Sequence, residues 1–188
     1  MPPTLRPATP ADLAGVVRVF LACWQGYAAV LPADVVARMD LPTAQELWRT
    51  ALDGGGVFVA VTPDPPAGGT ADEVIGVTRW SLADDDDGDG GADGVGLIGS
   101  LYVDPGHQGG GCGARLLAAA TDRLFERGCR TASLWVFADN APARGFYARQ
   151  GWRPDGTERV DARFGARELR LTLDLGPAAG PDRHEGAG

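Results

Sequence analysis

The most conspicuous absence in the sequence is lysine: all 17 basic residues among the 188 are arginine. A phosphate-binding loop of the GxxxxGK[ST] type needs a lysine, and so does an enzyme that forms a Schiff base through its own side chain. Both chemistries are therefore excluded. The 25 acidic residues give a formal net charge of −8, which argues against a nucleic-acid partner bound through a basic face.

Cysteine and histidine are also scarce. The three cysteines, Cys23, Cys112 and Cys129, form no CxxC pair, and only two histidines are present. This spacing favours neither a zinc site nor a disulfide framework, so we expect no metal and a reducing compartment. The sequence has no apolar run of about 18 residues and no signal-peptide pattern at its start. We therefore expect a cytoplasmic protein that contacts no membrane.

Helical and strand periodicities alternate along most of the chain and predict an α/β protein. Helices are expected from Thr9 to Trp24, after Pro32, from Thr43 to Gly54, from the glycines before Leu116 to Gly128, and from Asn140 to Gly151. Strands are expected over Val57–Thr62, Glu73–Leu82, Val95–Val103, Thr131–Phe137 and Glu168–Leu175. The length predicts one domain over residues 1–175, followed by a disordered Gly/Pro/Ala-rich tail over residues 176–188.

A loop with six aspartates and no base runs from Asp84 to Asp93. Such a run is typical of a solvated acidic hairpin, and the alternative is a surface that attracts a cationic amine. A literal GxGxxG match follows at Gly94–Gly99, which would indicate a dinucleotide-binding oxidoreductase. That fingerprint requires a strand before it and a helix after it, whereas this match lies at the start of and inside a strand. We therefore treat it as chance.

The informative segment is the glycine cluster over residues 106–113, which lies between an expected strand and an expected helix. Glycines permit positive φ angles and let a ligand approach the backbone closely. Several N–H groups can then point into one concavity beside the positive end of the helix dipole. Residues 105–115 contain no acid and one base, Arg115, so the segment suits a pyrophosphate. The alternative is a flexible turn.

Several motifs, taken in order, resemble the GNAT acyltransferase family. Gln108-Gly109-Gly110-Gly111-Cys112-Gly113 resembles its Q/R-x-x-G-x-G/A signature. Asn140-Ala141-Pro142-Ala143-Arg144-Gly145-Phe146-Tyr147, followed by Gly151-Trp152, resembles its N-x-x-A-x-x-F-Y-x-x-x-G-F/W segment. The resemblance spans roughly residues 4–175 and implies a mixed, mostly antiparallel sheet that is flanked by helices and contains a splayed strand pair.

The same resemblance implies acetyl-CoA as cosubstrate. The glycine loop would hold the pyrophosphate through backbone N–H groups, and the strand before it would pair with the pantetheine arm as a β-strand does. The cofactor residues implied in this way are Leu101, Tyr102, Val103, Gln108, Gly109, Gly110, Gly111, Cys112, Gly113, Ala114, Asn140, Ala143 and Phe146. For Asn140 the alternative is a helix cap alone.

For catalysis, the resemblance assigns Tyr147 as the general acid that protonates the departing CoA thiolate. The alternative is a tyrosine packed beside Phe146 in the core. The family often carries a glutamate at the start of the strand before the glycine loop, and here Gly94 and Gly96 occupy that place. Asp93, Asp104 and Glu168 are the candidates for the general base; for Asp104 the alternative is that it fixes the Asp-Pro turn.

The acceptor site is expected at the first helices, where Trp24 and Tyr27 lie; Trp24 also extends an apolar helical stripe. The predicted reaction is direct acetyl transfer to a primary amine of a small molecule or a peptide. The alternative function is a non-catalytic acyl-CoA sensor or interaction module of the same fold, since the position of the base departs from the family. Family members often dimerise, so a homodimer is a further expectation.

Overall fold

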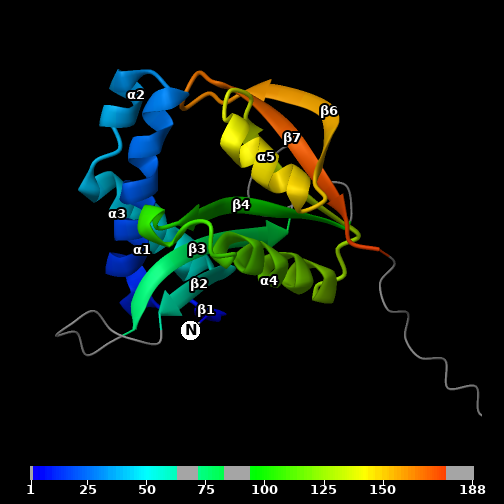
Figure 1. Cartoon of the computed structure of the whole chain (residues 1–188), viewed down its shortest axis with the longest axis horizontal. Helices are drawn as coiled ribbons and strands as arrows, with labels where there is room; N and C mark the ends of the chain where they lie inside the picture. Colours follow the sequence, from blue (N-terminus) through cyan, green and yellow to red (C-terminus); the bar gives the residue numbers. More distant parts are fainter. Residues whose placement is uncertain (1, 63–71, 83–93, 177–188) are drawn as a thin grey trace, which may run out of the picture.

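A computed structural model describes residues 2–62, 72–82 and 94–176 of the chain (Figure 1). Within these residues the strands form one sheet in the order β1-β2-β3-β4-β5-β7-β6. The strands are β1 (Thr4–Pro7), β2 (Val57–Thr62), β3 (Glu73–Leu82), β4 (Val95–Val103), β5 (Thr131–Phe137), β6 (Arg153–Val160) and β7 (Arg167–Asp174). The expected acidic loop, with Asp93, and the expected tail beyond Gly176 lie outside the described residues.

The sheet is antiparallel except between β4 and β5, which run parallel and pair only at their beginnings. Val95, Gly96 and Leu97 lie opposite residues 131–133, and no further pairs follow along the two strands. Beyond Leu97 the strands therefore diverge, and the backbone groups of β4 that face β5 lose their partner strand. This confirms the expected mixed, mostly antiparallel sheet with a splayed strand pair.

The helices are α1 (Leu13–Trp24), α2 (Ala33–Ala37), α3 (Leu41–Gly54), α4 (Cys112–Glu126) and α5 (Ala141–Arg149). Figure 1 shows α4 and α5 together in front of the sheet, with α1 to α3 gathered at its left. One core joins α1 and α3 to β2 and β3 around Phe20 and Trp48. A second core joins α4 to β4 and β5 around Leu124 and Leu134. None of the described helices combines the length and the apolar character needed to cross a bilayer.

Gly96 is one of the glycines of the literal GxGxxG match, and helix packing explains why a glycine occurs there. It lies inside β4, and a Cβ at this position would come within 2.4 Å of the Leu124 side chain of α4. This glycine therefore allows α4 to pack closely on the sheet. A strand, and no helix, follows it, as the sequence predicted.

The third helix begins earlier than expected. Thr43 is not its cap; α3 begins at Leu41, and the Asp40 side chain accepts a hydrogen bond from the Thr43 N–H at 2.9 Å. Pro42 fits the first turn because the N–H that it lacks would have no partner there. Asp40 and Thr43 are both residue types that often cap helices, and they lie three residues apart. Asp40, which precedes Pro42, is the residue that caps α3.

The turn before α1 is held by the carboxylate of Asp12. Asp12 accepts from the Thr9 N–H at 2.7 Å and from the Thr9 hydroxyl at 2.9 Å. It also pairs with both terminal nitrogens of Arg6, at 2.8 and 2.7 Å. The bond to Arg6, with smaller contributions from Thr9, lowers the pKa of Asp12 from 3.8 to about 2.

Asp12→Asn should lower the free energy of unfolding at pH 7 by roughly 1–2 kcal/mol, a range that allows for solvent screening of the half-exposed Arg6. Because the folded-state pKa is depressed, the contribution is fully present above pH 3.8 and is lost as the pH falls toward about 2. Urea unfolding of both proteins between pH 7 and pH 2 measures this difference. A difference that stays constant over the range would contradict the account.

Candidate functional site

A cleft of about 560 Å³ lies where the end of β4, the beginning of α4 and one face of α5 meet. Its wall consists of Leu101, Val103, His107, Gln108, Gly109, Gly111, Cys112, Gly113, Ala114, Asn140, Pro142, Ala143, Phe146, Tyr147, Arg149 and Gln150. None of these residues is acidic, although the chain as a whole carries a net charge of −8. The cleft therefore favours an anionic ligand.

The glycine loop forms one end of this cleft. Gly109 and Gly111 adopt φ angles of +79° and +80°, which other residues rarely take, and Gly111 is the N-cap of α4. A Cβ at either glycine would meet nothing within 4 Å. Backbone N–H groups and the N-terminus of α4 thus border open space, as an anion site requires.

The side chain of Cys112 belongs to the core. The residue is 3% exposed and packs with Ile75 and Leu116. Burial raises the pKa of its thiol, which disfavours the reactive thiolate. The charge of Arg115 opposes this effect but does not outweigh it, so the thiol of Cys112 is not activated as a nucleophile.

The strand β4 presents Leu101 and Val103 to the cleft and Tyr102 to the opposite face. The Tyr102 ring packs edge-on against Phe20 and Trp48, with ring centroids 5.1 and 6.2 Å apart. Since side chains alternate along a strand, the Tyr102 side chain does not face the cleft, and Tyr102 is absent from the cleft wall. The expected cofactor residues of β4 are thus divided between two faces.

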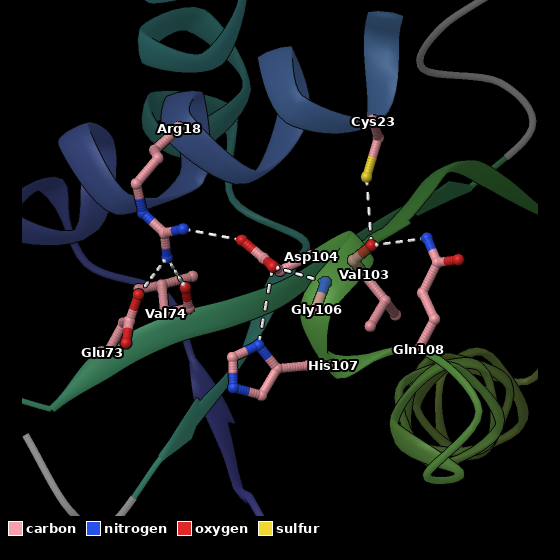
Figure 2. Close-up of polar contacts among 9 residues, drawn as sticks. All are labelled: Arg18, Cys23, Glu73, Val74, Val103, Asp104, Gly106, His107 and Gln108. Atoms are coloured by element: carbon pink, nitrogen blue, oxygen red, sulfur yellow. Dashed lines mark hydrogen bonds and ion pairs between the residues drawn. The ribbon is translucent and has the colours of Figure 1, made fainter. Parts of the chain in front are cut away.

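The Val103 carbonyl points toward the gap beside β4. Val103 lies opposite Gly76, and the next N–H, that of Asp104, donates to the Ile75 carbonyl at 2.9 Å. Because successive backbone groups of a strand point to alternate sides, the Val103 carbonyl faces away from β3. Figure 2 shows its two donors: the Cys23 thiol at 3.1 Å and the Gln108 side-chain amide at 3.0 Å.

The helix α5 forms the other wall. The Asn140 side chain caps it by accepting from the Ala143 N–H at 3.2 Å, and Asn140 also lines the cleft. Tyr147 combines both situations foreseen for it. Its ring packs against Phe146 and Trp152, with ring centroids 5.2 and 6.2 Å apart, and it borders the cleft. Burial raises the pKa of Tyr147, so its hydroxyl stays protonated.

The three tyrosines of the chain lie near one another, although they come from three distant segments. Tyr147 lies near Tyr102 and near Tyr27, which belongs to the 3₁₀ turn η2 (Gln25–Ala29) that follows α1. Tyr27 and Tyr102 also interact through their side chains, and burial raises the pKa of both. Within the described residues, no member of α1 or η2 belongs to the cleft wall. Tyr27 therefore lies near Tyr147 without lining the cleft itself.

Of the two aromatic acceptor-site candidates, Trp24 belongs to the core. It is 3% exposed and its indole N–H donates to the Val36 carbonyl at 3.0 Å. Tyr27 is half-buried and packs against Trp24 and Phe137. Only Tyr27 thus lies near both the cleft tyrosine and the surface.

Two of the three expected bases, Asp104 and Glu168, are described. Glu168 is 7% exposed, and its carboxylate pairs with Arg159 at 2.8 Å. Burial raises the pKa of Glu168, and the pairing with Arg159 offsets this in part. The charge of Glu168 contributes to the raised pKa of Tyr27, so the two residues lie near each other.

The charged residues of the cleft wall are Arg149 and, when protonated, His107. The base expected from the glycine segment, Arg115, turns away: its guanidinium donates to the Pro3 carbonyl at 2.6 Å. Our sequence interpretation did not include Arg149. The spacing of the helix could have predicted its place in the cleft wall, because Pro142, Phe146 and Arg149 share one face of α5.

Comparisons with known proteins agree with this geometry. The profile of the acetyltransferase (GNAT) family matches residues 22–152. An N-acetyltransferase of Archaeoglobus fulgidus is 32% identical over 153 residues, which cover 79% of this chain and 92% of that protein. An aminoglycoside N(6')-acetyltransferase of Stenotrophomonas maltophilia is 30% identical over 159 residues, which cover 84% of this chain and 90% of that protein.

The fold has solved counterparts as well. A Salmonella typhimurium acetyltransferase, solved with its cofactor acetyl-CoA, superposes with a TM-score of 0.67 at 21% identity and covers 97% of this chain and 99% of its own. At that identity the likeness concerns the fold. Together with the family match over more than half of the residues, the relatives establish that this chain belongs to the GNAT family of acetyltransferases.

Proposed function

We propose that the protein transfers an acetyl group from acetyl-CoA to a primary amine, and that residues 1–175 act as one catalytic domain. The observation that carries the proposal is the cleft that begins at the glycine loop and reaches the gap between β4 and β5; among the described residues, none in its wall is acidic. This arrangement offers N–H groups for a pyrophosphate at one end. At the other end it offers unpaired strand backbone and a buried hydroxyl for a thioester.

In this proposal the pyrophosphate binds the N–H groups of residues 108–114, at the N-terminus of α4. The pantetheine arm lies along β4 and hydrogen-bonds Leu101 and Val103 as an added strand would. Gln108, whose amide now donates to the Val103 carbonyl, then releases it to the arm. Asn140, Ala143 and Phe146 form the facing wall.

The proposed reaction forms a C–N bond between the amine and the acetyl carbonyl carbon and breaks the C–S bond of the thioester. Tyr147 gives its proton to the departing thiolate, which its protonated hydroxyl at the cleft wall is suited to do. A base takes the proton that the amine loses. Glu168, near Tyr27 and with a raised pKa, is the first candidate, and Asp93 is the second.

The release of free thiol from acetyl-CoA over a library of amines tests this function. The library should contain small amino acids, aminoglycosides and peptides with free N-termini, and mass spectrometry should identify the product. Aminoglycosides belong in it because the Stenotrophomonas relative is named for the acetylation of one of their amines. We expect thiol release that depends on one class of amine, with one acetyl group added per product molecule.

The sensor function makes a different prediction for the same assay. A non-catalytic acyl-CoA binder would bind CoA in a calorimetric titration and release no thiol with any amine. Thiol release that is stoichiometric with an acetylated amine would exclude it. Binding without release over the whole library would favour the sensor and contradict the enzyme.

Arg149→Gln should weaken CoA binding by roughly fivefold at low salt, because an exposed cation beside a bound phosphate contributes on the order of 1 kcal/mol. The difference should shrink as the ionic strength rises. Calorimetric titration at two salt concentrations measures both effects. Arg115→Gln is the matched control, since Arg115 donates to Pro3 outside the cleft. Equal losses in both variants would argue against a specific role of Arg149.

A further inference from the structure

One arginine outside the cleft joins three separate parts of the chain. Arg18 of α1 places one terminal nitrogen, Nη1, 2.7 Å from Oδ2 of Asp104, at the end of β4. Its other terminal nitrogen, Nη2, donates to the Val74 carbonyl at 2.6 Å and lies 2.8 Å from Oε1 of Glu73, at the beginning of β3. Figure 2 shows the guanidinium between these three partners. The first helix is thereby tied to the residue that precedes the glycine loop.

Asp104 in turn shapes the start of that loop. Its second oxygen, Oδ1, accepts from the Gly106 N–H at 3.0 Å, and its carbonyl accepts from the His107 N–H at 2.8 Å. These bonds form the 3₁₀ turn η4 (Pro105–His107), after which the chain enters the cleft wall at His107 and Gln108. Figure 2 shows Asp104 between Arg18 on one side and Gly106 and His107 on the other.

The two oxygens of the Asp104 carboxylate thus have different hydrogen-bond partners. Oδ2 is held by Arg18, while Oδ1 is left to cap the turn. Burial alone would raise the pKa of Asp104, but the Gly106 N–H and Arg18 outweigh it and lower the pKa, so the carboxylate stays ionised. The guanidinium also contacts Val74 and Glu73, so Arg18 connects Asp104 to the beginning of β3. Arg18 itself is absent from the cleft wall.

We propose that Arg18 is a positioning residue for the cofactor loop, because its guanidinium orients Asp104 so that the turn into the pyrophosphate-binding glycines is formed before the cofactor arrives. The proposal rests on the proposed function and deepens it. A loop that is already ordered loses less conformational entropy on binding. Without Arg18, only part of the population has the competent loop, and the apparent dissociation constant rises by the inverse of that fraction.

The test is calorimetric titration of CoA into the full chain and into Arg18→Gln. We expect the dissociation constant to rise roughly tenfold, which corresponds to a competent fraction of about one tenth. Arg18→Lys keeps a charge near Asp104 but not the planar fork that reaches three partners, so its loss should be intermediate. In kinetics, the KM for acetyl-CoA should rise while kcat is retained.

Two further variants separate positioning from general stability. Arg6→Gln breaks the ion pair between Arg6 and Asp12, which lies outside the cleft wall. This pair and the one that Arg18 forms are comparable in burial, because the Asp12 side chain is 9% exposed and the Asp104 side chain 16%. Arg6→Gln should bind CoA within about twofold of the original chain. Glu73→Gln removes one of the two contacts of Arg18 with β3, so its loss of affinity should be smaller than that of Arg18→Gln. A rise in the dissociation constant for Arg6→Gln equal to that for Arg18→Gln would overturn the proposal.

A shortened substrate provides the readout that a merely structural role would not move. The acetyl thioester of pantetheine lacks the pyrophosphate, so kcat/KM for this substrate should be the same in Arg18→Gln and in the original chain. Equal losses with both thioesters would overturn the positioning role. If the original chain itself fails to bind CoA, the proposed function fails and the inference fails with it. Normal CoA binding by both proteins overturns the inference alone.

Discussion

Tyr147→Phe is expected to lower kcat for acetyl transfer by about a hundredfold, which is the typical lower range of a lost general acid. The KM for acetyl-CoA should change little, because the phenyl ring keeps the packing against Phe146 and Trp152. Steady-state kinetics with the best amine of the library measures both constants. The physical reason is that the thiolate must then leave without the proton that the Tyr147 hydroxyl supplies.

The leaving group offers a control for this assignment. An acetyl thioester of an acidic aryl thiol needs no proton to leave, so Tyr147→Phe should lose far less rate with it than with acetyl-CoA. A loss of the same size with both thioesters would indicate that Tyr147 shapes the site without donating a proton. Unchanged turnover with acetyl-CoA would remove Tyr147 from the acid role.

Gly111→Ala should raise the dissociation constant for CoA more than about tenfold. An alanine in the left-handed conformation costs ~1–2 kcal/mol, and the loop relieves this strain by moving away from the conformation that binds CoA. Gly111 has a φ of +80° at the N-cap of α4, and the open space at its Cβ position is the space that the cofactor would fill. Both the strain and the added methyl group therefore act on the N–H groups that face the ligand. Calorimetric titration with CoA measures the loss.

The chain provides a matched control at the other end of the same helix. Gly128 has a φ of +90° and also has nothing within 4 Å of its Cβ position, but it lies outside the cleft wall. Gly128→Ala should therefore lower the melting temperature about as much as Gly111→Ala and leave CoA binding unchanged. Loss of CoA binding in both variants would show that backbone strain outside the cleft also abolishes binding, and would contradict a specific role of Gly111.

Local patterns predicted the centre of the fold well. The strands β2, β3, β4 and β5 have the expected bounds because their apolar runs end at strong turn residues such as Pro105. The edge strand β6 was not expected. Its residues are mostly exposed and include Pro154 and Gly156, so neither alternation nor β-propensity marks them, and pairing with β7 is what makes them a strand.

Those parts of the site that lie within a single sequence motif could be predicted from the sequence. The glycine loop and the Asn140–Tyr147 segment contain their own signals, and the structure brings them to one cleft. Strand alternation could also have separated Tyr102 from Leu101 and Val103. The proximity of Tyr27 to Tyr147, and the grip of Arg18 on Asp104, depend on how distant segments pack, which no local pattern in the sequence carries.

The most direct test of the central claim, that the cleft beside the glycine loop is a CoA site, is calorimetric titration of CoA into the full chain. We expect saturable binding of one CoA per chain, weakened more than about tenfold in Gly111→Ala and unchanged in Gly128→Ala. Absence of binding at millimolar CoA, or equal binding by all three proteins, would contradict the claim.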